Sequence, residues 1–322
     1  MVLKNASILI TGGTGSLGKS LINHLLNNSD ARRIIIFSRD ELKQQALRIA
    51  YGENDRLRFF LGDIRDQQRL TRAMHGVDFV FHAAALKQVD TGEYNPMEFI
   101  KTNVIGSSNV IEACLDANVK RVVALSTDKA SSPINLYGAT KLTADKLFIA
   151  ANTYGSSYGT KFSVVRYGNV MGSRGSVIPF FLEKSQMGQA LPVTDRRMTR
   201  FWISIEEATK FVTNALLDMN GGELYVPKIP SFRITDLAQV ISPNSETVEI
   251  GLRPGEKLHE EMISFDDSRR TVIEKNRYIV CPQWEDPAER GQLVPEGFEY
   301  RSDTNSEWLD PDSLKEIIAK LV

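Results

Sequence analysis

The sequence contains few cysteines: Cys114 and Cys281 are the only two among its 322 residues. Two cysteines cannot build a disulfide framework, and their separation does not suggest a metal site. Cys114 falls in a helical pattern and is expected to be a small core residue, and neither cysteine is a candidate nucleophile. The histidines are also scattered, so we expect no catalytic metal. They are His24, His75, His82 and His259.

The chain has no excess of charge of one sign and no long hydrophobic run. Its formal net charge is −1, so a nucleic-acid partner is not expected. No stretch approaches the roughly 18 apolar residues of a membrane helix, so no integral membrane segment is expected. The apolar run at residues 7–10 is short and ends in glycines, which predicts a strand and not a secretion signal. With so few cysteines, the sequence favours a cytoplasmic protein.

The first half of the chain alternates short apolar runs with helical periodicity. This alternation predicts βαβ units and a parallel sheet that helices cover on both faces. The expected fold class is therefore α/β: a Rossmann-like doubly wound parallel sheet with a smaller mixed α/β lobe. Strands are expected at residues 7–10, 34–37, 57–61, 79–82, 121–125 and 162–166, and helices at 17–26, 41–51, 67–74, 95–118, 137–158 and 204–219.

The alternation ends after Arg166, where glycine, proline and loop signals become frequent. One further helical pattern begins near Ser204, a residue type that often caps helices. We therefore assign residues 1–166 and 198–222 to the Rossmann domain, and residues 167–197 and 223–322 to the substrate-binding lobe.

A glycine-rich segment follows the first expected strand and opens the first helix. Gly12 permits a tight turn, Gly15 lets the backbone approach a pyrophosphate, and Gly18 lets the helix pack closely. The helix N-terminus would then face the anion. In this strand–helix context the segment predicts dinucleotide binding, although a glycine-rich turn without chemistry stays an alternative. The candidate residues are Gly12, Thr14, Gly15, Ser16, Leu17 and Gly18.

The end of the second strand should distinguish NAD from NADP. Ser38 stands where an acidic residue would bind the ribose hydroxyl of NAD, and Arg39 and Lys43 could both meet a 2′-phosphate. We therefore predict NADP, although Arg39 and Lys43 could also be solvated residues at a helix start. Asp40 is expected to cap that helix.

Later strand ends offer further candidate contacts for the cofactor. An adenine edge could lie beside the residues after the third strand, and small side chains after the fourth would admit a ribose or nicotinamide. Lys87 is a candidate for both cofactor and substrate binding, although Asp63 could be a plain helix cap and Lys87 a surface lysine. The candidates are Asp63, Ile64, Ala83, Ala84, Ala85 and Lys87.

Three residues near the fifth strand form a candidate reaction site. Thr127 follows that strand, and Tyr137 and Lys141 are four residues apart, which places them on one face of the next helix. A nearby ammonium and a positive nicotinamide would lower the pKa of the tyrosine and make it a usable base. Thr127 can hydrogen-bond the same substrate oxygen.

With these motifs the chain resembles the extended short-chain dehydrogenase/reductase family over nearly its whole length. The resemblance implies that Thr127, Tyr137 and Lys141 move a hydride between a sugar carbon and the nicotinamide. The segments HAAALKQV, EYNP and STDKASSPINLYGATK, at residues 82–89, 93–96 and 126–141, resemble those of the inverting UDP-N-acetylglucosamine 4,6-dehydratases of that family. Those enzymes begin the pathway to pseudaminic acid, and relatives commonly self-associate, some as hexamers.

Within that resemblance, Asp128 and Lys129 would form the elimination pair. Tyr137 would take the proton from O4 of the sugar, Lys129 the proton from C5, and Asp128 would release O6 as water. Tyr137 or Lys129 would then return a proton to C5 from the opposite face. A lysine acts as a base only if burial or a neighbouring cation lowers its pKa. In the alternative interpretation, Asp128 is a turn residue and Lys129 a surface cation.

The resemblance also places substrate contacts in the second lobe. Asn169 would contact the diphosphate or the sugar, and Arg253, in the segment RPGEK, would pair with the diphosphate. Val177 belongs to the loop after Asn169, together with Ser173, Arg174 and Ser176. Whether the segments 195–197 and 199–201 contact the substrate or are solvated loops is left open.

Two other functions compete with this interpretation. A UDP-sugar 4-epimerase or a retaining 4,6-dehydratase would share the fold, but the pair Asp128–Lys129 speaks against both. An NADP-sensing binding protein would keep the fold without catalysis. The complete set of Thr127, Tyr137 and Lys141 disfavours the sensor, which has no need of it.

Overall fold

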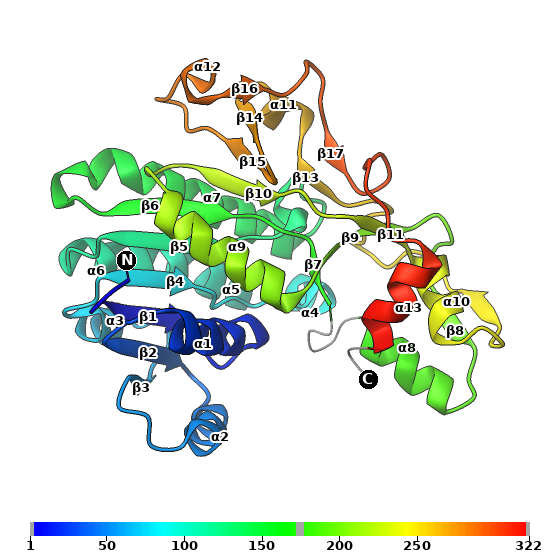
Figure 1. Cartoon of the computed structure of the whole chain (residues 1–322), viewed down its shortest axis with the longest axis horizontal. Helices are drawn as coiled ribbons and strands as arrows, with labels where there is room; N and C mark the ends of the chain where they lie inside the picture. Colours follow the sequence, from blue (N-terminus) through cyan, green and yellow to red (C-terminus); the bar gives the residue numbers. More distant parts are fainter. Residues whose placement is uncertain (1–2, 172–176, 320–322) are drawn as a thin grey trace.

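A ten-stranded sheet forms the centre of the molecule in the computed structural model, which describes residues 3–171 and 177–319 (Figure 1). Its strand order is β16-β14-β15-β10-β6-β5-β4-β1-β2-β3. Seven strands are parallel: β1 (Ser7–Thr11), β2 (Arg33–Ser38), β3 (Leu57–Leu61), β4 (Phe79–His82), β5 (Arg121–Leu125), β6 (Lys161–Val165) and β10 (Leu224–Pro227). Three short antiparallel strands extend one edge: β14 (Thr271–Glu274), β15 (Arg277–Val280) and β16 (Gln292–Leu293).

Helices cover both faces of this sheet, which confirms the Rossmann-like class predicted from the sequence. Successive strand residues alternate between two apolar cores: Ile8 and Ile10 belong to one, and Leu9 to the other. On one face α1 (Ser16–Asn28) packs against α9 (Ile205–Asp218), and on the other α6 (Gly106–Asp116) packs against α3 (Gln67–Met74) and α7 (Leu136–Tyr154). The helix α2 (Glu41–Tyr51) contacts β2 and β3.

The expected caps and buried residues are found where the sequence placed them. Ser204 caps α9 with a reciprocal bond to Glu207, and Asp40 caps α2 by accepting from the Lys43 backbone. Cys114 and Cys281 are both buried. Within the described part of the chain, no helix combines the length and the apolar character needed to cross a membrane.

The helix expected over residues 95–118 is divided in the structure. A short helix α4 (Val89–Tyr94) precedes α5 (Pro96–Phe99), and the π-helical segment η1 (Ile100–Ile105) joins α5 to α6. Such π segments insert extra backbone and often occur near functional sites. Here η1 carries Asn103, which hydrogen-bonds the backbone of Leu86 and the hydroxyl of Thr140. It thus ties the segment after β4 to α7.

The second lobe has its own core and its own small sheets. One sheet joins β7 (Asn169–Val170), β9 (Thr199–Ile203) and β11 (Ser231–Arg233), and another pairs β8 (Leu191–Val193) with β12 (Thr247–Glu249). Trp202, Phe181 and Leu314 are among the buried residues of its core. The helices of this lobe are α8 (Val177–Gln186), α10 (Ile234–Ile241) and α13 (Pro311–Ala319).

The division between the lobes differs from the expected one after residue 222. The strands β10, β14, β15 and β16, which we assigned to the substrate-binding lobe, belong to the central sheet. The reason is that β10 is fully buried and pairs in parallel with β6, so it continues the sheet, and β15 then pairs with β10.

The remaining elements are the paired strands β13 (Glu261–Ile263) and β17 (Tyr300–Arg301), the short helices α11 (Phe265–Ser268) and α12 (Pro287–Arg290), and the 3-10 turns η2 (Asp128–Ala130) and η3 (Ser156–Tyr158).

Candidate active site

A cavity of about 1120 Å³ lies at the carboxyl ends of the parallel strands and reaches into the second lobe. Its walls come from the β1–α1 turn, the ends of β4 and β5, α7, and the segments around Asn169, Val193 and Arg253. Most of the residues that we predicted to act in catalysis or to bind cofactor or substrate line this one cavity. They are Gly12, Thr14, Gly15, Ser16, Leu17, Gly18, Lys43, Ala83, Ala85, Lys87, Thr127, Lys129, Tyr137, Lys141, Asn169, Val177 and Arg253.

The glycine turn has the geometry that a pyrophosphate site requires. Gly12 has a φ of +67°, and a Cβ there would lie 2.8 Å from the backbone nitrogen of Ala84. A Cβ on Gly18 would lie 2.6 Å from the backbone of Gly13, so α1 begins in close contact with the turn. Gly15 is the N-cap of α1 and offers no capping side chain, which leaves helix N–H groups for an anion.

Five other predicted cofactor residues do not line the cavity. The hydroxyl of Ser38 is buried and accepts a hydrogen bond from Gln44 at 3.0 Å. Arg39 lies 3.5 Å from Asp63, which also pairs with Arg65 at 2.7 Å. Asp63 is therefore held in an ion cluster and is not the helix cap, a position that Asp66 takes. The residues outside the cavity wall are Ser38, Arg39, Asp63, Ile64 and Ala84.

The predicted Thr127, Tyr137 and Lys141 come together at the cavity. Burial raises the pKa of Tyr137 to about 12, although the charge of Lys129 and a hydrogen bond with Thr127 act in the opposite direction. We expected Lys141 to lower this pKa, but in the structure Lys129 has that effect and Lys141 faces the carboxylate of Asp145. Burial lowers the pKa of Lys141, and Asp145 opposes the shift.

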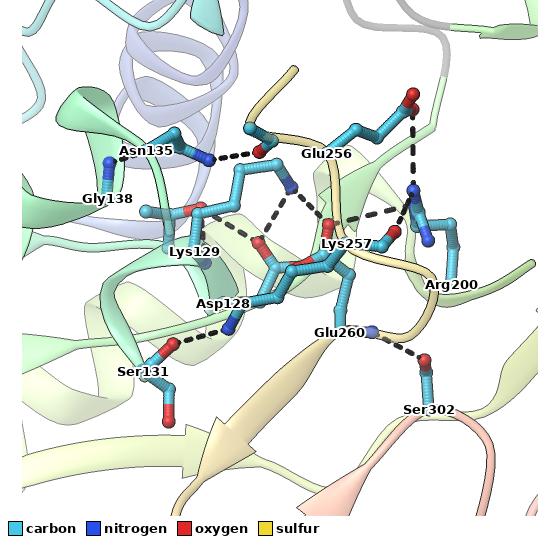
Figure 2. Close-up of polar contacts among 12 residues, drawn as sticks. Asp128, Lys129, Ser131, Asn135, Gly138, Arg200, Glu256, Lys257, Glu260 and Ser302 are labelled. Atoms are coloured by element: carbon cyan, nitrogen blue, oxygen red, sulfur yellow. Dashed lines mark hydrogen bonds and ion pairs between the residues drawn. The ribbon is translucent and has the colours of Figure 1, made fainter. Parts of the chain in front are cut away.

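Asp128 and Lys129 belong to a buried ion cluster with Glu260 (Figure 2). The Nζ atom of Lys129 lies 3.1 Å from Oδ1 of Asp128 and 2.9 Å from Oε1 of Glu260. Both carboxylate side chains are about 1% exposed. The hydroxyl of Thr127 donates to Asp128 at 2.9 Å. Lys129 and Glu260 line the cavity, whereas Asp128 does not. Asp128 is therefore in contact with two cavity residues and is itself covered.

The charges in this cluster differ from our expectation for Lys129. Burial alone would lower its pKa, but the charges of Asp128 and Glu260 outweigh burial and raise the pKa. The lowered pKa that a lysine base needs is therefore not found in this arrangement, because Glu260, a second carboxylate, contacts the ammonium of Lys129. Burial and the charge of Glu260 raise the pKa of Asp128, as suits an acid.

The segment around residues 255–261 holds in place the loop between β5 and α7 (Figure 2). Lys257 donates to the carbonyl of Ser131 at 2.7 Å, and Asn135 donates to the carbonyl of Gly255 at 2.7 Å. Glu261 accepts hydrogen bonds from the hydroxyls of Ser131 and Ser132. Asn135 also caps α7 by accepting from the backbone of Gly138. The position of α7, and thus of Tyr137, depends on this segment.

A second buried network lies behind Lys141. Asp145, one turn further along α7, accepts a hydrogen bond from Ser126 at 2.7 Å and pairs with Arg166 at 3.3 Å. Arg166 also donates to the carbonyl of Met262 at 2.9 Å. This network joins β5, β6 and α7 to β13 beneath the reaction site.

The second lobe supplies part of the cavity wall. Asn169, Val177 and Arg253 line it as predicted, and Arg200 does so as well. The segments 195–197 and 199–201, whose role the sequence left open, lie in different places. Arg200 lies at the cavity, whereas the segment 195–197 does not line it: Arg197 pairs with Asp195, and Arg196 with Glu249. Ser173, Arg174 and Ser176 lie outside the described residues.

Sequence reasoning missed Glu260, Asp145 and Asn103. Glu260 and Asp145 are acidic residues in helical or loop patterns that look like solvated surface charges. The one available signal was their spacing: Asp145 follows Lys141 by four residues, and Glu260 lies three residues after Lys257 of the RPGEK segment. Neither spacing alone indicates burial.

Comparison with known proteins agrees with this geometry. Residues 8–282 match the family model described as "Polysaccharide biosynthesis protein". A protein of Campylobacter jejuni subsp. jejuni serotype O:23/36 (strain 81-176), named UDP-N-acetylglucosamine 4,6-dehydratase (inverting), is 53% identical over 97% of both chains. A Rickettsia rickettsii protein named UDP-glucose 4-epimerase is 44% identical over 85% of this chain and 82% of its own.

Two solved structures share the fold. The structure of Pen from Bacillus thuringiensis has a TM-score of 0.93 and 38% identity and covers 100% of both chains. DesIV of Streptomyces venezuelae, a dTDP-glucose 4,6-dehydratase with NAD bound, has a TM-score of 0.70 and 26% identity and covers 78% of this chain and 86% of its own. The family match extends over most of this chain and includes both the glycine turn and the Tyr137–Lys141 pair. The chain belongs to the polysaccharide biosynthesis protein family of extended short-chain dehydrogenases/reductases.

Proposed function

We propose that the protein catalyses the NADP-dependent 4,6-dehydration of UDP-N-acetylglucosamine with inversion at C5. The product would be UDP-2-acetamido-2,6-dideoxy-β-L-arabino-hex-4-ulose. The observation that carries this proposal is the contact of Asp128 with Lys129 directly beside Thr127, Tyr137 and Lys141. A hydride-transfer set alone would serve a reductase or an epimerase, whereas a neighbouring acid and amine suit an elimination. The 53% sequence identity to the Campylobacter jejuni enzyme supports the same activity.

The described residues fit a nicotinamide dinucleotide. The open N-terminus of α1 and the space left by Gly12 and Gly18 would hold the pyrophosphate. Arg39 and Lys43 would meet the 2′-phosphate of NADP after leaving Asp63 and Asp40. When bound, the cofactor would accept hydride from C4 of the sugar and return it at C6.

The side chains of this chain would carry the protons. Tyr137, near Lys141 and in reach of Thr127, would take the proton from O4. The resulting ketone acidifies C5–H, and Lys129, which lines the cavity, would remove that proton in its neutral amine form. Asp128, whose raised pKa favours its protonated form, would supply the proton with which O6 leaves as water. A proton delivered to C5 from the opposite face completes the inversion.

The remaining parts of the proposal concern context. Lys87, Asn169, Val177 and Arg253 would contact the nucleotide sugar, with Arg253 pairing with its diphosphate. The product would enter the pathway to pseudaminic acid. We also propose that the protein acts in the cytoplasm as a homo-oligomer, such as a hexamer.

The test is to incubate the purified protein with UDP-N-acetylglucosamine and NADP in heavy water and to follow the sugar by proton NMR. We expect a 4-keto-6-deoxy sugar with deuterium at C5 and the L-arabino configuration, and no net NADPH formation. Lys129→Ala should abolish the formation of this sugar. Lys120→Ala is the matched control, because Lys120 is exposed and pairs with Asp78, and it should leave product formation unchanged. A product that retains its C5 configuration would contradict the inverting chemistry.

A 4-epimerase is the second candidate, because the Rickettsia rickettsii relative carries that name. The same spectra separate the two activities. An epimerase would return a sugar that keeps its 6-hydroxyl and its C5 proton and differs only at C4. If that product formed from a UDP-hexose and no 6-deoxy sugar appeared, the dehydratase proposal would be rejected.

A further inference from the structure

Asn135 is a buried residue directly before α7 and lies two residues before Tyr137 in the chain. Its side chain makes two hydrogen bonds of 2.7 Å in different directions (Figure 2). Oδ1 accepts from the backbone N–H of Gly138, which caps the helix, and Nδ2 donates to the backbone carbonyl of Gly255, 120 residues further along the chain. A helix cap needs only the first of these bonds, so the second requires another explanation.

The backbone around Gly255 lies directly against Asn135. Gly255 has a φ of +75°, and a Cβ there would lie 2.9 Å from the Cβ of Asn135, so a side chain would separate the two segments. Two residues before Gly255 is Arg253, which lines the cavity and which we propose to pair with the diphosphate. The hydrogen bond from Asn135 therefore joins the helix of Tyr137 to the segment of Arg253.

Arg200 on β9 fixes the other side of this segment. Its side chain is about 6% exposed and donates to the backbone carbonyls of Lys257 and Leu258, both at 3.0 Å. It also lies 3.5 Å from Glu256, which accepts a hydrogen bond from the backbone N–H of Arg253. The segment that carries Arg253 is thus attached to β9 on one side and to α7 on the other.

The proposed substrate spans the distance between Arg253 and Tyr137. Its diphosphate is bonded to C1 of the sugar, and the hydroxyl that Tyr137 would deprotonate is on C4, across the ring. Since Arg253 would hold the diphosphate, the separation of Arg253 from Tyr137 decides where O4 lies. Errors of about 1 Å in the placement of reacting atoms can slow a reaction about 100-fold, so this separation has to be fixed.

We propose that Asn135 is a positioning residue that fixes the separation between Arg253 and Tyr137, so that binding of the diphosphate places O4 of the sugar against Tyr137. This inference rests on the function proposed above. It assigns Asn135 no contact with the reacting atoms, since both polar ends of its side chain are engaged within the protein. Binding energy from the diphosphate would thereby raise kcat and not only lower KM.

Two substitutions keep the helix cap and remove the bridge. Asn135→Asp retains an oxygen for the N–H of Gly138 but has no donor for the carbonyl of Gly255. Asn135→Ser also retains a capping oxygen, is too short to reach Gly255 and adds no charge. In the NADP-loaded protein we expect both to lower kcat between about 10- and 100-fold, while KM, the affinity for UDP alone and the melting temperature change little.

Asp66→Ala is the matched control, because Asp66 caps α3 and does not line the cavity. It should lower the melting temperature and leave kcat and KM unchanged. The proposal is overturned if both Asn135 variants keep kcat within about threefold of the wild type, or if their kcat falls only in proportion to the fraction of folded protein.

A double-mutant cycle with Arg253→Ala separates positioning from a local effect on α7. Without Arg253 the diphosphate is no longer held, so Asn135→Ser should cause little further loss of kcat/KM in that background. Losses that multiply would show that Asn135 acts on α7 alone, and they would overturn the proposal.

Hydride transfer separates this proposal from the proposed function, because an epimerase and a dehydratase both begin by oxidising C4. In a single turnover, the transient NADPH absorbance should appear about 10- to 100-fold more slowly in Asn135→Ser than in the wild type. If the wild type transfers hydride but forms no 6-deoxy sugar, the dehydration fails while these rates still test Asn135. Equal rates in the variant and the wild type would overturn the positioning role.

Discussion

Arg166, directly after β6, and Asp145 on α7 form an ion pair of 3.3 Å in which both side chains are only about 3% exposed. The pair lies beneath the reaction site, because Asp145 also faces Lys141 and accepts a hydrogen bond from Ser126. Burial raises the pKa of Asp145, and Arg166 acts against that shift. The charge of Asp145, and with it the environment of Lys141, therefore depends on Arg166.

Removing one partner of this pair should be much more harmful than removing both. Arg166→Met leaves a buried carboxylate without its cation, and we expect a loss of about 3 to 5 kcal/mol in the free energy of unfolding. The double change Arg166→Met with Asp145→Leu should recover most of it. Urea unfolding measures both, and equal losses in the two variants would contradict the interpretation.

His82 should make the protein sensitive to acid. Burial, and then the charge of Lys141, lower the pKa of His82 from 6.5 to about 3. Because the folded pKa lies below the unfolded one, the unfolded state binds more protons in this window, and stability falls as the pH decreases below 6.5. The slope contributed is about 1.4 kcal/mol per pH unit.

His82→Gln tests this linkage. The variant should be less stable near pH 7.5 by about 1 to 3 kcal/mol, because the bonds of His82 to Thr11 and Ser107 are changed. Between about pH 6.5 and 4.5, however, its free energy of unfolding should fall less steeply than that of the wild type. Parallel curves over that range would show that His82 is not the group responsible.

The choice of cofactor should depend on Arg39 and Lys43. Arg39 pairs with Asp63 and Lys43 pairs with Asp40, and Lys43 lines the cavity. Replacing both by alanine should weaken NADP binding by roughly tenfold or more while leaving NAD binding nearly unchanged. Calorimetric titration with each cofactor measures this, with Arg72→Ala, an exposed arginine on α3, as the control. Equal weakening of both cofactors would argue against contact with a 2′-phosphate.

Gly138 should tolerate no side chain. A Cβ there would overlap the carbonyl oxygen of Lys129, so α7 could not stay against the turn η2. We expect Gly138→Ala to lower kcat by more than about tenfold and the stability by about 1 to 3 kcal/mol. The exposed neighbour Ala139, changed to serine, is the control. Wild-type melting and turnover in Gly138→Ala would disprove this packing argument.

Local patterns predicted the parts of the site that depend on neighbouring residues in the chain. The turn at Gly12 and the shared face of Tyr137 and Lys141 follow from spacing, because one turn or one helix fixes their geometry. The parallel sheet was predictable for the same reason, since each βα unit repeats a local pattern. The cap at Ser204 likewise needs only its own first helical turn.

The parts that could not be predicted depend on contacts between distant segments. Nothing near Lys129 in the sequence indicates that Glu260 contacts its ammonium, so the sequence did not indicate that the pKa of Lys129 is raised. Ser38 was a candidate cofactor residue at the end of the second strand, but Gln44 on α2 donates a hydrogen bond to its hydroxyl. The assignment of β10 to the second lobe failed to match the sheet because pairing with β6 is a property of the whole fold.

The ion cluster joins Lys129 to a residue that the ribosome adds 131 positions later. Because synthesis proceeds from the N-terminus, the glycine turn, β5 and α7 emerge from the ribosome long before Glu260 and the residues that fix the loop at Ser131. Until then Lys129 lacks Glu260, one of the two carboxylates with which it pairs. A nascent or truncated chain that stops before residue 260 thus contains the glycine turn, β5 and α7 but lacks this second carboxylate.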